Sequence, residues 1–140
     1  MEHHWKGKKP NPDKYYGFVY EITNNINGRK YIGMKQYSFS RKKKVKGSVR
    51  RRSFILPSKW EFYTGSCNEL NDDIEKFGKE NFTFKIIWNC TTRGMMKYME
   101  AKEQFKKDVL IGVIDGTTVP KYYNRQILGN IRFIPKGVCR

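Results

Sequence analysis

The stretch that decides the fold reads Gly17-Phe18-Val19-Tyr20-Glu21-Ile22-Thr23-Asn24, and it continues shortly afterwards as Asn27-Gly28-Arg29-Lys30-Tyr31-Ile32-Gly33. Two runs rich in β-branched and aromatic residues, separated by Asn and Gly residues, predict an antiparallel hairpin over residues 16–34. Because side chains alternate along a strand, we expect Phe18, Tyr20 and Ile22 to share one face of the first strand.

The register of this hairpin depends on how its turn closes. A loop over residues 23–28 sets Tyr20 opposite Tyr31, whereas a tighter Asn27-Gly28 turn sets Tyr31 opposite Asn24. Since the side-chain period of a strand is two, both registers leave Tyr20 and Tyr31 on the same face. Two neighbouring phenols on a small sheet are explained either as ordinary core packing or as part of a functional site.

Downstream patterns predict two helices and a third strand. Ser66-Cys67-Asn68-Glu69 forms a capping box, and the helix that it begins should end at Gly78. Alternating apolar residues over 82–88 predict the third strand, with Trp60 and Trp88 buried. A second helix is expected over about 95–110, and a short strand near 131–134. The apolar stripe of the second helix is expected to consist of Met95, Met99, Phe105 and Val109. This order predicts an α/β (α+β) fold with a small three-stranded, mainly antiparallel sheet flanked by helices.

Charge is the strongest compositional signal. The 140 residues include 29 Lys and Arg but only 13 Asp and Glu, which gives a net charge of +16. A domain so basic repels itself unless a polyanion neutralises it; nucleic acid is the commonest such partner, with a membrane surface or a heparin-like glycan second. Mean hydropathy is -0.79, and the chain contains no apolar run of the roughly 20 residues that a membrane span needs. A soluble protein without a membrane partner is therefore expected.

The cysteines and histidines of the chain bear on its cellular compartment and on the kinds of catalytic or metal site that it can form. Cys67, Cys90 and Cys139 are an odd number without metal-type spacing, so we expect reduced thiols and a cytoplasmic location. No apolar stretch opens the chain, so no secretory signal is expected. The only histidines, His3 and His4, lie at the N-terminus. This placement argues against histidine-based zinc sites and Ser/His/Asp triads.

Two basic segments flank the hairpin. Residues 1–14 hold four lysines and are expected to be a poorly ordered arm. Residues 41–52 hold eight basic residues and no acid, and a loop or insertion is expected because like charges at this density oppose a packed element. The expected organisation is thus an arm over 1–14, a domain over 15–128 with the basic insertion 41–52, and a tail over 129–140.

The tyrosine motifs resemble the opening of the GIY-YIG nuclease family. Tyr31-Ile32-Gly33 matches the second tripeptide, whereas Phe18-Val19-Tyr20 stands where the family has Gly-Ile-Tyr and keeps only the tyrosine. The similarity continues through residues 60–66, 77–78, 81–84, 98–105 and 123–124, so that it covers about 15–128. These later stretches are similar to phage homing endonucleases of the family.

The resemblance implies an endonuclease that hydrolyses DNA phosphodiester bonds with one divalent metal. In the family a glutamate on the later helix binds this metal, and Glu100 matches it, with Glu103 as second choice. One carboxylate suffices, because Mg²⁺ (or Mn²⁺) keeps most of its waters and also binds substrate phosphate oxygens. The competing interpretation is that both glutamates only form ion pairs with lysines of their own helix.

The resemblance also implies roles for the remaining site residues. Tyr20 corresponds to the candidate general base, and Tyr31 would position the water or the phosphate. An ordinary phenol has a pKa near 10, so we expect neighbouring cations to lower the pKa of Tyr20. The family carries an arginine on the helix after the second motif, and Arg41, ten residues after Tyr31, fits that spacing. Asn124 matches a late Tyr-Asn pair whose amide supports the site; a plain turn asparagine is the alternative.

The basic insertion completes the predicted DNA interface. Its expected nucleic-acid-binding residues are Lys42, Lys43, Lys44, Lys46, Arg50, Arg51 and Arg52; the three arginines are also alternatives to Arg41. The expected partner is double-stranded DNA, with monomer and homodimer both open, and the location is the host cytoplasm if the protein is phage-encoded. The alternative functions are a non-catalytic basic nucleic-acid-binding module with a degenerate nuclease site, and a structural RNA-binding protein. The latter explains the charge but not the tyrosine pair.

Overall fold

The computed structural model describes residues 2–44, 47 and 51–132, with the backbone alone over 40–44 and 51–54. Its central sheet has the strand order β1-β6-β2-β3. These strands are β1 (Lys6–Gly7), β2 (Gly17–Asn24), β3 (Lys30–Gln36) and β6 (Phe82–Cys90). Strand β2 is antiparallel to both of its neighbours, and only β1 runs parallel to β6.

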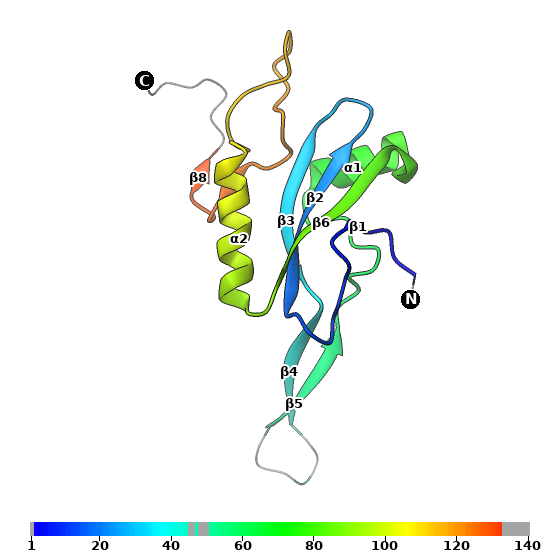
Figure 1. The fold of residues 1–140 in the computed structure, drawn as a ribbon, viewed down its shortest axis with the longest axis vertical. Helices are drawn as coiled ribbons and strands as arrows, with labels where there is room; N and C mark the ends of the chain where they lie inside the picture. The colour runs from blue at the N-terminus through cyan, green and yellow to red at the C-terminus, as the bar shows by residue number, and fades with distance from the viewer. Residues whose placement is uncertain (1, 45–46, 48–50, 133–140) are drawn as a thin grey trace.

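The two helices cover opposite faces of this sheet (Figure 1). Helix α1 (Asn68–Phe77) is followed by a single 3-10 turn, η1 (Lys79–Asn81), and α2 (Arg93–Lys106) follows β6. The predicted α+β fold with a small, mainly antiparallel sheet is therefore confirmed, with four strands in place of three. None of the helices in the described part of the chain is long and apolar enough to cross a bilayer.

The β2–β3 hairpin has a register between the two that were predicted. Tyr20 pairs with Gly33 and Ile22 with Tyr31, because a backbone hydrogen bond from Asn24 N to Arg29 O closes a loop intermediate in length. Both predicted registers are thus wrong by two residues. A shift of two preserves the facing of every side chain. Tyr20 and Tyr31 consequently share a face, as predicted, with ring centroids 6.2 Å apart.

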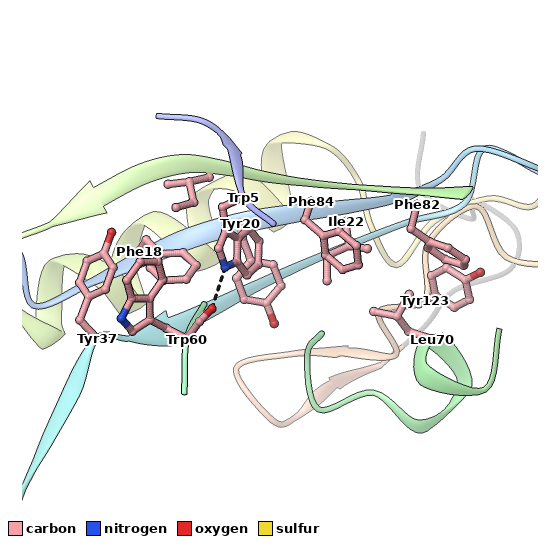
Figure 2. Packing of buried hydrophobic residues seen from close by; sticks show 11 residues of the cluster. Trp5, Phe18, Tyr20, Ile22, Tyr37, Trp60, Leu70, Phe82, Phe84 and Tyr123 are labelled. Atoms are coloured by element: carbon pink, nitrogen blue, oxygen red, sulfur yellow. Dashed lines mark hydrogen bonds between the residues drawn. The ribbon is translucent and has the colours of Figure 1, made fainter. Parts of the chain in front are cut away.

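The face under α1 carries an aromatic core that extends to the N-terminus (Figure 2). Phe18, Tyr20 and Ile22 point into it from β2, and Leu70 closes it from α1. Trp5 is buried among them and donates its indole Nε1 to the Trp60 carbonyl oxygen at 2.7 Å. The expectation of a poorly ordered N-terminal arm is therefore wrong, because the apolar surface of Trp5 and the β1 pairing hold this segment on the sheet.

The residues with which α2 packs against the sheet differ in part from those predicted. Met96 is buried against Val19 and Ile32, whereas Met95 and Phe105 are each 49% exposed. The sheet-facing side of α2 also carries Glu103 and Gln104. The predicted stripe is therefore wrong at Met95 and Phe105, whereas Val109 is buried and Met99 packs against this core as predicted.

A β-bulge explains the position of Trp88. The β2–β6 register shifts between Val19 and Tyr20, so that Tyr20 pairs with Ile86 but Val19 pairs with Trp88. Trp88 therefore leaves the face of Phe84 and Ile86 and lies on the α2 side, where it is 37% exposed. Its predicted burial is wrong, whereas that of Trp60 is confirmed.

The start of α1 also differs from its predicted cap. Cys67 is the N-cap and makes no side-chain capping bond, so Ser66 does not cap the helix. Glu69, the other half of the predicted capping box, instead pairs with Arg29 and Arg125. The helix ends at Gly78, as predicted, with a positive φ of 90° there.

The basic segment forms a hairpin instead of a loop. Strands β4 (Ser38–Lys44) and β5 (Arg51–Pro57) pair antiparallel, and together they project beyond the central sheet (Figure 1). Arg41, Lys42, Lys43 and Lys44 lie on β4, and Arg51 and Arg52 on β5. Lys46 and Arg50 lie outside the described residues, as does Cys139. Near the C-terminus, β7 (Gln126–Ile127) pairs with β8 (Ile131–Arg132), close to the predicted short strand.

Candidate active site

A cavity of about 540 Å³ lies beside the edge strand β3, between the start of α1 and one side of α2. Its walls come from four segments that are distant in sequence. The lining includes Tyr31, Cys67, Lys97, Glu100, Asn124 and Arg125. Tyr31, Glu100 and Asn124, which the sequence predicted as site residues, are thus brought together.

Tyr20 does not line this cavity, but it lies beside Tyr31, and its hydroxyl is close to Gly33 and Gly65. A Cβ added to Gly33 would lie 2.5 Å from the Tyr20 Oη, and one added to Gly65 would lie 3.2 Å from it. The Tyr20 side chain is fully buried, and burial raises its pKa well above 10. Tyr31, Tyr63, Glu100 and Cys67 raise this pKa further. The expectation that neighbouring cations lower the pKa of Tyr20 is therefore wrong for the free protein.

Tyr31 is the phenol that lines the cavity. Burial raises its pKa to about 12, and a hydrogen bond with the Ser66 side chain acts in the opposite direction. Ser66 thus contacts the second tyrosine instead of capping α1. Both phenols are accordingly neutral near pH 7 in the free protein.

The two glutamates of α2 have different surroundings. Glu103 accepts a hydrogen bond from Trp88 Nε1 at 2.9 Å and pairs with Lys107 at 3.6 Å. Burial alone would raise the pKa of Glu103, but these two partners bring it below its usual value. Glu103 therefore fits the interpretation of a helix ion pair.

Glu100 faces the cavity and makes no hydrogen bond or salt bridge within the described residues. Burial raises the pKa of its carboxyl to about 7, and the charge of Lys97 acts in the opposite direction. A half-buried carboxylate without a partner is energetically unfavourable unless a cation accompanies it. Of the two candidates, only Glu100 presents such a carboxylate to the cavity.

Asn124 ties the end of the chain to the second tyrosine motif. Its Oδ1 accepts from Ile32 N at 3.0 Å, and its Nδ2 donates to Ile32 O at 2.8 Å. The side chain thereby pairs with the edge of β3 as a strand would. The alternative of a plain turn asparagine does not fit these two bonds. Asn124 holds Ile32, and with it the position of the neighbouring Tyr31.

Two arginines that share one carboxylate at the cavity, Arg29 and Arg125, were not predicted as site residues. Arg29 is buried, with its guanidinium 4.0 Å from the Tyr123 ring centroid and 2.7 Å from Glu69 Oε1. Arg125 contacts the same carboxylate from the cavity side at 2.7 Å. The sequence did hold one signal for Arg125, because it directly follows the Tyr-Asn pair that the family resemblance singled out.

Arg41 is not on the helix where the family's arginine is expected. Its backbone pairs with Phe54 in the β4–β5 hairpin, whereas the helix that follows the second motif is α1, whose sequence NELNDDIEKF contains no arginine. The spacing from Tyr31 was misleading because the β4–β5 hairpin is inserted between the second motif and that helix.

Comparison with known protein families identifies one matching family model. It is described as "Putative endonuclease segE, GIY-YIG domain" and matches residues 2–127. Neither the curated proteins nor the solved structures contain a match to the chain. The match includes both tyrosine motifs, Glu100 and Asn124, and it also includes the N-terminal segment that packs on the sheet. The chain belongs to the GIY-YIG nuclease family.

Proposed function

We propose that the protein is an endonuclease that hydrolyses phosphodiester bonds in double-stranded DNA with one divalent metal ion. We further propose a phage-type homing or mobility role, exercised in the cytoplasm. The observation that carries the proposal is the position of the Glu100 side chain. Its carboxylate is unpaired within the described residues and faces the cavity that Tyr31 and Asn124 also line. The chain is at the same time a nuclease domain by family.

The residues of the cavity fit a single-carboxylate metal site. A carboxylate oxygen is the ligand that Mg²⁺ or Mn²⁺ prefers, and Mg²⁺ commonly uses one or two protein carboxylates together with water and phosphate oxygens. Within the described residues no group of three His, Cys, Asp or Glu side chains is placed to hold a metal. Bound there, the ion would act as a Lewis acid toward the phosphate.

The other residues of the site act on the substrate and on one another. Asn124 fixes β3, so that Tyr31 presents its hydroxyl to the cavity at a defined position. Tyr31 then orients the attacking water or the phosphate, and Tyr20, whose ring centroid lies 6.2 Å from that of Tyr31, is the proposed proton acceptor. Because burial raises the pKa of Tyr20, this role requires that the bound reactants stabilise the phenolate.

The departure from the family motif at Phe18 affects the core and leaves the cavity intact. Phe18 is fully buried, and its ring packs 5.0 Å from Trp5 and 5.1 Å from Tyr37. It fills space in the aromatic cluster and does not line the cavity. A non-catalytic module with a degenerate site therefore gains no support from this substitution.

The test is cleavage of supercoiled plasmid with Mg²⁺ or Mn²⁺ and with EDTA. We expect metal-dependent nicking or cutting by the wild type and no cutting by Glu100→Gln, with DNA binding retained. Glu103→Gln is the matched control, since the same charge is removed one turn along the helix from a side chain that is paired. Loss of cleavage in Glu103→Gln but not in Glu100→Gln would contradict the assignment, and an inactive wild type would contradict the function.

A further inference from the structure

Two cations line the cavity within the described residues. Lys97 lies on α2, one turn before Glu100, and Arg125 directly follows Asn124 in the C-terminal lining segment. Neither was predicted as a site residue. Arg125 is the better placed to hold a fixed geometry, because it is anchored by a second side chain whereas Lys97 is an exposed lysine on a flexible stem.

The anchor of Arg125 is Glu69, in the first turn of α1. The Arg125 Nη2 contacts Glu69 Oε2 at 2.7 Å and Oε1 at 3.1 Å. Glu69 is held from behind by Arg29, whose Nη2 donates to Oε1 at 2.7 Å and whose Nε donates to the Pro120 carbonyl oxygen at 2.9 Å. The carboxylate is therefore fixed between a buried guanidinium and one that reaches the cavity.

The chemistry of a guanidinium suits a phosphodiester. Arg125 contacts Glu69 through its Nη2. A guanidinium has a planar, permanently charged fork of N–H donors whose geometry matches phosphate oxygens. The Arg125 side chain is 46% exposed, so a ligand in the cavity can reach it. Helix α1 contains no arginine, but it contains Glu69, the carboxylate that holds Arg125 at the cavity.

We propose that Arg125 binds the phosphate at which the strand is cut, and that Glu69 positions it for this contact. This inference rests on the proposed nuclease function. It replaces the role that the sequence gave to Arg41, and it makes Glu69 a positioning residue instead of half of a helix cap. Charge that develops on the phosphate oxygens in the transition state would be stabilised by a donor already in place.

The first test compares Arg125→Ala with Arg93→Ala in single-turnover plasmid cleavage. Arg93 is an exposed arginine at the start of α2 and outside the cavity, so its loss changes net charge equally. Removal of one such donor typically lowers a rate by roughly 10²- to 10³-fold, and we expect this loss only in Arg125→Ala. We further expect partial rescue of Arg125→Ala, and not of Glu100→Gln, by added guanidinium chloride at a concentration that leaves the fold intact by circular dichroism.

The second test addresses Glu69. If Glu69 acts through Arg125, Glu69→Gln lowers the cleavage rate in the wild-type background but has little further effect in the Arg125→Ala background. Equal additional losses in both backgrounds would overturn the positioning role. Cleavage by Arg125→Ala at the Arg93→Ala rate would overturn the inference while leaving the nuclease function standing; absence of cleavage by the wild type would instead overturn the function itself.

Discussion

Gly33, in the second motif, has to be a small residue because Tyr20 of the first motif packs against it. The Tyr20 ring lies across Gly33, and an added Cβ would lie 2.5 Å from Tyr20 Oη and 2.9 Å from Tyr31 Cε2. Real side chains do not approach so closely, so one of the two phenols would have to move. The glycine of Tyr31-Ile32-Gly33 is thus explained by the close approach of the two tyrosines that the motifs contribute.

This contact predicts that Gly33→Ala destabilises the protein by about 1–3 kcal/mol, the usual effect of overpacking, and that it reduces cleavage by displacing a phenol. Gly94→Ala is the control, because nothing lies within 4 Å of its Cβ position and it is in a helix, where alanine is favoured by roughly 0.5–1 kcal/mol. Urea unfolding of both variants provides the comparison. Equal stability of the two variants would contradict the explanation.

Removal of single hydroxyl groups separates the roles of the two tyrosines. Tyr20→Phe keeps the buried ring, so we expect little change in stability but a cleavage rate lower by roughly 10²- to 10⁴-fold, as for loss of a general base. Tyr31→Phe loses the Ser66 hydrogen bond and a positioning contact, and a smaller loss is expected. Single-turnover rates decide between them. A larger loss in Tyr31→Phe would assign the proton acceptor to the phenol that lines the cavity.

Site residues were predictable from sequence where motif spacing carries them. The structure brings Tyr31, Glu100 and Asn124 together at one cavity, with Tyr20 beside Tyr31, and their membership of the active site and their roles stay predictions. Arg125 was missed because its position is fixed by a contact with Glu69, 56 residues away in the sequence. A contact between side chains of different elements leaves no periodic signal in the sequence.

At the scale of elements, the β2–β3 hairpin, β6 and both helices were predictable as to existence and type, whereas β1, the β4–β5 hairpin and the facing of individual side chains were not. The bulge in β6 moves Trp88 to the other face of the sheet. The alternation of apolar and polar residues along a strand does not indicate where such an extra residue is inserted. Helix α2 places Glu103 and Gln104 toward the sheet because Trp88 and the Ile32 carbonyl satisfy their side chains. Propensity and hydrophobicity do not include such tertiary partners.

The N-terminal segment carries a histidine whose pKa is changed by the fold. His4 stacks on Phe84 with ring centroids 3.9 Å apart. Burial, followed by the charge of Lys79, lowers the pKa of His4 from 6.5 to about 4. The Tyr63 backbone acts in the opposite direction, although neither ring nitrogen has a hydrogen-bond partner within the described residues. Folding therefore disfavours the charged form of this ring.

We therefore expect stability contributed by neutral His4 to be complete above pH 6.5 and to be lost as the pH falls from about 6.5 toward 4. The effect should be on the order of 1 kcal/mol, because the ring is only partly buried. His4→Phe keeps the stacking and should flatten this loss in urea unfolding at pH 7 and pH 4.5. Glu100 has the opposite effect, because burial raises the pKa of its carboxyl from 4.5 to about 7. Its ionisation lowers the stability of the folded protein as the pH rises from 4.5 to 7. An identical pH slope for wild type and His4→Phe would contradict the prediction.

At the scale of the whole molecule, the net charge of +16 is unevenly placed. The β4–β5 hairpin carries half of it and projects beyond the sheet (Figure 1). Its register sets Lys43 opposite Arg52 and Lys44 opposite Arg51. Eight cations without an acid in so short a stretch of sequence repel one another, and a polyanion would relieve this repulsion. The charge of this segment therefore favours a role for the hairpin in binding phosphates.

The salt dependence of DNA binding measures this role. Each neutralised phosphate contributes about 0.9 to the log–log slope of affinity against salt for duplex DNA. If about half of the hairpin cations contact phosphates at once, replacement of Lys42, Lys43, Lys44 and Lys46 by Ala should flatten the slope by roughly two. The matched control replaces four exposed lysines outside the hairpin, namely Lys76, Lys85, Lys102 and Lys121. A smaller change is expected there, because net charge alone does not determine which side chains contact phosphates.

The two variants are compared on two unrelated duplexes, because phosphate contacts position a protein without reading bases. Equal flattening on both duplexes is the expected result for the hairpin variant, since its cations would follow the backbone of any sequence. A loss confined to one duplex would make the hairpin a base-reading element instead. Equal slopes for the hairpin variant and the control would place the hairpin away from the DNA, and the repulsion among its cations would then need a different counter-charge.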